Sequence, residues 1–141
     1  MDAFYAGLFS FWATQSANAF YTGIGGRLRN NQARQNETRP YCVVTQVDGL
    51  PEYFQDGHYD ELAYIELQFD IYSETNLEVL ALSKKFMTLF DTATFSVTGW
   101  GLLELERFRS LLMPLEKDED MDNPLHRYLL QYTATLQKAR V

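Results

Sequence analysis

The sequence predicts a single α+β domain, in which helices cover one face of a mainly antiparallel four-stranded sheet. Three observations lead to this fold class. Residues 61 to 72 alternate apolar and polar side chains, as a strand with one buried face does. A capped helical segment with an apolar stripe follows directly, and a second alternating segment closes the chain. With one more helix and two more strands, the expected order is helix, strand, strand, helix, strand, strand.

The first half of the chain supplies a helix, a turn and a strand. Residues 2 to about 16 are predicted to be helical, because apolar side chains recur there at helical spacing: Phe4, Leu8, Phe11 and Trp12. The glycines of residues 23 to 26 predict a turn, since they match neither the dinucleotide-binding nor the P-loop spacing. Residues 41 to 47 form a predicted strand that follows Pro40 and ends at an Asp-Gly turn.

The second half supplies the second helix and two more strands. Thr75 and Glu78 predict a capping box, in which the Thr75 hydroxyl accepts from the Glu78 amide and the Glu78 side chain reaches back. The apolar stripe behind this cap contains Val79, Leu82, Phe86, Leu89 and Phe90. The strand pattern returns after residue 94, and its phase slips at Arg107-Phe108, which indicates a β-bulge. The last strand is predicted from about His126 to Lys138.

Three irregular segments separate the predicted elements of this one domain, which spans residues 1 to 141. Residues 27 to 40 are a polar arm with four arginines against one glutamate. Residues 48 to 60 are a long loop with two Asp-Gly turn signals. Residues 114 to 125 are an acidic loop, in which five carboxylates lie beside one lysine. We find no internal domain boundary in the sequence.

The composition disfavours several classes of function. The chain has 141 residues and a formal net charge of -7, which opposes simple attraction to nucleic-acid phosphates. Its single cysteine, Cys42, cannot form an internal disulfide, so a reducing compartment is expected. The apolar N-terminal run lacks the basic start of a signal peptide and is too short to span a bilayer. We therefore expect a soluble protein of the cytoplasm with no membrane partner.

The acidic loop partly matches a calcium-binding loop. Asp118, Asp120 and Asp122 occupy the places of the first, third and fifth ligands. However, Asn123 replaces the glycine of the sharp turn, and Leu129 stands where the bidentate glutamate belongs. We therefore predict no metal site and expect the loop to be solvated or to meet a partner. A weak divalent-ion site is the open alternative.

The sequence contains no recognisable catalytic motif. His58 and His126 lie far apart and outside any known pattern, and Cys42 alternates with its neighbours as a buried strand residue does. Glu104 and Glu106 share a strand face and could form an acid–base pair, but solvated charges on an exposed sheet face fit the same pattern. We predict that the protein is not an enzyme and has no cofactor.

The candidate functional residues are charged and aromatic side chains in the irregular segments. Arg27, Arg29 and Arg34 could contact the aspartates of the acidic loop in another copy, if these two patches lie on opposite flanks. Such a head-to-tail contact closes into a ring when the rotation permits. Tyr53 and Phe54 have no periodic partner, so we expect them to be exposed in their loop and to contact a partner.

Three segments carry a resemblance to a known family. They are Arg39-Pro40-Tyr41 with VVTQVDG behind it, the strand-to-helix segment YIELQFDIYSETNLEVLALSKKF, and the closing strand YLLQYTATL after the acidic loop. In this order of elements, over residues 1 to 138, the chain resembles the tail-terminator (tail-completion) proteins of long-tailed bacteriophages.

The resemblance implies an α+β fold that forms a ring, usually of six subunits, at the head-proximal end of the tail. Such a ring ends polymerisation of the tail-tube protein and joins the tail to the head connector or head-closure protein. It implies no catalysis, a place in the virion after assembly in the host cytoplasm, and DNA that passes without specific binding. A net negative charge suits that passage, because a like-charged lumen does not hold DNA.

Two alternatives stay open at this stage. One is another neck or minor capsid role, such as head closure, which uses similar small folds. The other is a small-molecule-binding domain or an enzyme that uses the space between sheet and helices. A convergent cluster of polar groups in a closed pocket would favour this second alternative, whereas exposed aromatic side chains and a self-complementary edge would favour assembly.

Overall fold

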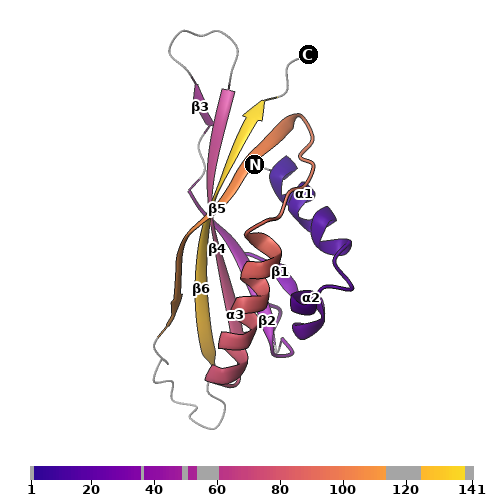
Figure 1. Ribbon diagram of the computed structural model, residues 1–141, viewed down its shortest axis with the longest axis vertical. Coiled ribbons are helices and arrows are strands. Elements are labelled where there is room, and N and C mark those ends of the chain that lie inside the picture. The colour runs from indigo at the N-terminus through magenta and orange to yellow at the C-terminus, as the bar shows by residue number, and fades with distance from the viewer. Residues whose placement is uncertain (1, 36, 49–50, 54–60, 114–124, 139–141) are drawn as a thin grey trace.

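The computed structural model describes residues 2–35, 37–48, 51–53, 61–113 and 125–138 (Figure 1). It contains three helices and six strands, which in chain order are α1 (Asp2–Ala13), α2 (Ala19–Gly23), β1 (Leu28–Asn30), β2 (Tyr41–Asp48), β3 (Pro51–Tyr53), β4 (Glu61–Ser73), α3 (Asn76–Phe90), β5 (Trp100–Leu112) and β6 (His126–Lys138). No helix among these residues is long and apolar enough to cross a membrane.

All six strands belong to one sheet, in the order β1-β2-β4-β6-β5, with β3 paired to the start of β4. Only the β1–β2 pair is parallel. The predicted α+β class is therefore confirmed, but the predicted count of four strands is wrong. The four long strands match the expected ones, and the two additional strands have three residues each, too few to show a periodic pattern.

The two short strands also correct the predicted loops. β1 occupies part of the polar arm of residues 27 to 40, where Leu28, Arg29 and Asn30 pair with Cys42, Val43 and Val44. β3 occupies part of the predicted loop of residues 48 to 60 and pairs with the start of β4. The five-residue helix α2 lies where no helix was predicted, and α1 ends at Ala13 rather than near residue 16.

The helices lie on one side of the sheet, and the other side is uncovered by helices (Figure 1). The strand faces that point to the helices are apolar, as predicted, and β6 buries Leu130, Tyr132, Ala134 and Leu136 there. Helix α3 packs on this face through Phe86 and Phe90, whose rings lie 4.8 and 5.2 Å from that of Phe69. Its predicted apolar stripe is buried throughout.

The start of α3 differs in one contact from the predicted capping box. The Glu78 amide donates to the Thr75 hydroxyl at 3.1 Å, as expected. The Glu78 carboxylate, however, meets the hydroxyl of Ser73 instead of the Thr75 amide. Ser73 in turn accepts from the Thr75 amide at 3.4 Å. The hydroxyl of Ser73, at the buried end of β4, thus lies between the Glu78 carboxylate and the Thr75 amide.

Strand β5 contains the predicted bulge and a second one. Its register against β6 shifts between Arg107 and Arg109, which leaves Phe108 as the additional residue. The prediction of a bulge at Arg107-Phe108 is confirmed. A further shift between Leu102 and Glu104 leaves Leu103 as an additional residue. The sequence alternates Leu103, Glu104, Leu105 and Glu106 without interruption, so this second bulge left no visible phase slip.

Helix α1 packs closely against the segment between α3 and β5. The ring of Phe4 lies 5.6 Å from that of Phe95, and the ring of Phe11 stacks on Phe95 at 5.5 Å. At Gly7 the helix comes so near this segment that a Cβ atom would overlap the carbonyl oxygen of Ser96. A glycine is needed here because the neighbouring atom belongs to backbone, which cannot turn away as a side chain can.

We predict that Gly7→Ala destabilises the fold by about 1–3 kcal/mol, because α1 must shift away from Ser96 to accommodate the methyl group. Gly101→Ala is the matched control, since a Cβ there would meet nothing closer than the Gln137 carbonyl oxygen at 3.8 Å. Urea unfolding followed by circular dichroism measures both free energies. Equal stability of the two variants would contradict the close approach.

Candidate functional site

The arginines of the polar arm are partly occupied by contacts within the chain. Arg27 donates from Nε to the carbonyl oxygen of Pro40 at 3.0 Å. Arg29 forms an ion pair with Glu37 at 2.7 Å, and the Glu37 side chain is only 5% exposed. Arg34 is exposed. The structure therefore separates the three predicted contact arginines into two that hold the arm together and one that faces solvent.

The other predicted contact residues lie at or beyond the limits of the described structure. Tyr53 is the last residue of β3 and pairs with Glu61 of β4. Phe54, Asp118, Asp120 and Asp122 lie outside the described residues, as does His58. The hypothesis that the arginines meet the acidic loop of another copy remains a prediction.

An exposed surface that the sequence did not predict lies along the edge strand β5. Four large apolar side chains of this strand are exposed, namely Leu103, Phe108, Leu111 and Leu112. Leu103 and Phe108 are 58% and 51% exposed, and both are the additional residues of bulges. Within this strand only Leu105 is buried. We call this surface, residues 102 to 112 of β5, the β5 edge.

The charged residues of the β5 edge divide between the two faces of the sheet. Glu104, Glu106 and Arg109 lie opposite Thr135, Thr133 and Gln131 of β6, which point away from the helices. Arg107 lies opposite Tyr132, whose buried side chain points toward the helices. Glu104 and Glu106 thus share one exposed strand face, as predicted.

A polar junction joins the β5 edge to the end of α3. Asp91, which follows α3, accepts from Nε and Nη2 of Arg107, each at 3.2 Å, and from the hydroxyl of Tyr132 at 2.5 Å. Arg107 also donates to the Ser110 hydroxyl at 3.1 Å. Burial, followed by the hydrogen bond to Asp91, raises the pKa of Tyr132 well above its ordinary value. Tyr132 therefore stays a neutral donor to the Asp91 carboxylate.

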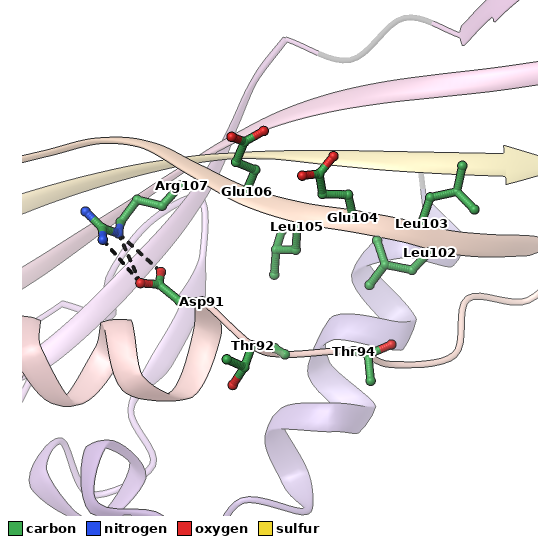
Figure 2. Close-up of a pocket in the computed structure, with 10 residues that line it drawn as sticks. Asp91, Thr92, Thr94, Leu102, Leu103, Glu104, Leu105, Glu106 and Arg107 are labelled. Carbon is green, nitrogen blue, oxygen red and sulfur yellow. Dashed lines mark hydrogen bonds and ion pairs between the residues drawn. The ribbon is translucent and has the colours of Figure 1, made fainter.

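A groove of about 400 Å³ lies beside this junction, between the segment of residues 91 to 94 and the β5 edge. Figure 2 shows Leu102 and Leu105 pointing from β5 toward that segment, whereas Glu104 and Glu106 point away from it. The Asp91 carboxylate at one end of the groove is already paired with Arg107. The groove therefore offers two threonine hydroxyls and leucine side chains, without a convergent set of unpaired charged groups.

A second polar cluster lies on the uncovered face of the sheet. Arg127 donates to Asp70 at 2.7 Å, and Gln68 donates to the other oxygen of Asp70 at 2.9 Å. Gln131 extends the cluster by donating to Gln68 at 3.1 Å. Burial, followed by the charge of Asp70, raises the pKa of the neighbouring Tyr72 to about 12. The cluster joins β4 to β6.

Neither the Cys42 thiol nor the described acidic and histidine side chains form a reactive or metal-binding site. Cys42 is fully buried in β2, as predicted, and burial raises the pKa of its thiol well above the ordinary value. Such a thiol is not activated as a nucleophile. Among the described residues, no three His, Cys, Asp or Glu side chains gather where they could hold a metal ion.

The sequence offered one signal for the β5 edge and none for the junction. The phase slip at Phe108 indicated a bulge, and bulges concentrate at sheet edges, so the slip could have marked β5 as an edge strand. The contact of Asp91 with Tyr132 spans 41 residues, and no local pattern relates the two.

The fold is similar to that of known structures. A chain of a solved structure titled "Virion of native gene transfer agent (GTA) particle" matches with a TM-score of 0.71 and 12% sequence identity. The match covers 94% of this chain and 92% of that chain. No protein-family model matches the sequence, and no curated protein is significantly similar to it. At this sequence identity, the likeness concerns the fold.

We predict that Asp91→Ala destabilises the fold by about 1–3 kcal/mol, because the Tyr132 hydroxyl is left in a largely buried place without its acceptor. In a Tyr132→Phe background the same substitution should cost less, since the stranded hydroxyl is gone. The difference between the two costs, measured by urea unfolding of all four chains, gives the coupling energy. Equal costs in both backgrounds would show that the hydrogen bond does not contribute.

The free energy of unfolding should fall as the pH rises above about 10. The folded-state pKa values of Tyr132 and Tyr72 lie above the ordinary tyrosine value of 10.0, so the unfolded chain loses these protons first. Their contribution is complete below pH 10 and is lost as the pH rises toward the folded-state values. Tyr132→Phe should reduce the slope between pH 10 and 12, and an unchanged slope would contradict the assignment.

Proposed function

We propose that this protein is a structural component of a virion, and more specifically a tail terminator that forms a ring at the end of the tail tube. The observation that carries the proposal is the fold shared with a virion chain over 94% of the sequence. The order of elements that resembles the tail-terminator family supports the finer assignment. The partners would be further copies of the chain, the tail-tube protein and the head connector or head-closure protein.

The chemistry of the described residues supports a role in assembly over a role in catalysis. Asp91 and Arg107, at the end of the groove beside α3, are already paired with each other, and Glu104 and Glu106 point away from the groove (Figure 2). The β5 edge, by contrast, exposes four large apolar side chains, which is a feature of surfaces that meet partners. We therefore propose that the protein has no enzymatic activity and no cofactor. The groove has no cluster of polar side chains that point toward one place, as a small-molecule ligand would need.

The net charge of -7 also suits a ring through which DNA passes. A net negative chain repels the phosphate backbone, so DNA would not adhere to the lumen. The proposed place of the protein is the neck or tail of the virion, after assembly in the host cytoplasm. A head-closure protein would share the fold and the charge, and only its binding partner would differ.

Native mass and tail-tube binding test the proposal together. A ring of six chains would have a mass of six times 16.4 kDa, roughly 98 kDa, and would show a central hole by negative-stain imaging. Binding to the end of purified tail tubes would support the terminator, and binding to the head connector alone would support head closure. A chain that stays monomeric and binds neither would overturn the proposal.

A charge reversal at Arg34 tests the head-to-tail contact with the acidic loop. Arg34 is the suitable position, because reversing Arg29 would also break the internal ion pair with Glu37. Arg34→Glu should weaken ring formation at least about tenfold, since an attraction to carboxylates becomes a repulsion. The matched control is Lys84→Glu on the exposed side of α3, which should leave ring formation unchanged. Equal behaviour of the two variants in analytical ultracentrifugation would contradict the contact.

A further inference from the structure

The β5 edge has unpaired backbone groups along one side. β5 ends the strand order of the sheet, so its N–H and C=O groups on the side away from β6 have no strand partner among the described residues. Such an edge is a template for another strand. Its two bulges, at Leu103 and Phe108, prevent one regular ladder along all of β5. They leave two regular stretches, residues 104–107 and residues 109–112.

The charges of the β5 edge are separated by sign along the strand. Glu104 and Glu106 lie in its first half, and Arg107 and Arg109 follow in its second half. Arg107 is paired with Asp91, but the other three have no ion-pair or hydrogen-bond partner within the described part of the chain. A strand with this order of charges complements itself only in antiparallel orientation, because parallel pairing places like charges side by side.

The apolar side chains of the same strand add to this complementarity. Of the eight large apolar side chains that are exposed in the described residues, four belong to β5. They flank the charged positions on both sides, with Leu103 before them and Leu111 and Leu112 after them. An antiparallel partner would therefore cover apolar side chains at each end of the contact, and removing them from water favours association.

We propose that the β5 edge binds the β5 edge of a second copy of this chain in antiparallel orientation, with Glu106 of each copy opposite Arg109 of the other. In this register, residues 104–107 of one copy face residues 108–111 of the other. Both charged side chains lie on the uncovered face of the sheet, as residues that face each other across an antiparallel pair must. Leu105 lies opposite Ser110 on the helix-covered face.

The two-fold axis of this contact passes between Arg107 and Phe108, so the bulge at Phe108 of one copy meets the same bulge of the other. The contact is isologous: the same patch serves on both copies, and it closes after two chains. It goes beyond the proposed ring, because a head-to-tail ring uses two different patches. It can join two free chains, or two rings at their β5 edges.

A charge swap tests the register. Glu106→Arg and Arg109→Glu should each weaken self-association of the β5 edge about tenfold, because two attractions per pair of copies become two repulsions. The double variant with both substitutions restores opposite charges in this register and should associate as the unaltered chain does. Sedimentation equilibrium of the four chains, in the Arg34→Glu background that weakens the ring contact, measures the dissociation constants. Single variants that associate unchanged, or a double variant that is not restored, would overturn the proposal.

A cross-link provides an independent readout. Phe108→Cys places a thiol next to the proposed two-fold axis and should give a covalent dimer under mild oxidation, within the distance that a disulfide spans. Leu77→Cys is the matched control, because Leu77 is 82% exposed but lies at the start of α3. The native Cys42 is buried and does not interfere. Equal yields of covalent dimer from both positions would count against the proposal.

The two proposals fail separately. If Phe108→Cys does not cross-link and the charge swap has no effect while rings still form on tail tubes, the β5 contact is wrong and the proposed function stands. If two-fold dimers form at the β5 edge but the chain neither forms rings nor binds tail tubes or connectors, the proposed function is wrong and the β5 contact stands.

Discussion

The packing of α3 on the centre of the sheet is the interaction on which the rest of the structure depends. Phe69 of β4 and Tyr132 of β6 lie on neighbouring central strands and meet edge to face, with ring centroids 5.8 Å apart. Phe86 of α3 packs on both of these rings. Because β4 and β6 pair along twelve successive residues, this aromatic contact is held in a rigid frame. This contact determines which face of the sheet the helices cover. The remaining strands must therefore place their apolar side chains on that same face.

Because helices cover only one face of the sheet, polar side chains at the margin of each face need hydrogen-bond partners within the chain. On the covered face, the hydroxyl of Tyr132 reaches the end of α3 and finds Asp91, whose carboxylate also binds Arg107. A buried phenol and an edge strand are thereby tied to one helix end. On the uncovered face, Asp70 is nearly buried yet satisfied, since Arg127 and Gln68 both donate to it. Both clusters pair their charges within the chain, so they contribute to stability more than to recognition.

Within the part of the chain that the structure describes, the surfaces left without internal pairing are the margins of the sheet. The polar arm, which contains β1, and the β5 edge lie at opposite ends of the strand order, because β1 and β5 are the two outer strands. The polar arm is the patch proposed for the head-to-tail contact with the acidic loop, and the self-complementary β5 edge adds a two-fold contact. The two kinds of contact are compatible in one assembly of dihedral symmetry, and each depends on different side chains.

The sequence by itself determined the long elements, because each has enough residues for its period to appear. The alternation in β4 and β6, the apolar stripe of α3 and the bulge at Phe108 are all local patterns. The Thr75 cap was equally visible, but the contact of Glu78 with Ser73 was not, since it depends on how β4 enters the helix. Local patterns also indicated a buried Cys42 and an exposed pair, Glu104 and Glu106.

Only the tertiary structure decided the strand order, the short strands and the candidate surface. Strands of three residues contain no period, so β1 and β3 exist only because β2 and β4 offer them a partner. Whether β5 lies at the centre or the edge of the sheet depends on pairing between residues that are distant in sequence, such as Leu112 with Tyr128 and Trp100 with Lys138, and no local pattern records it. The exposure of Leu103 and Phe108 follows from that edge position. For the same reason, a leucine-rich strand that resembles core in the sequence is an exposed edge in the fold.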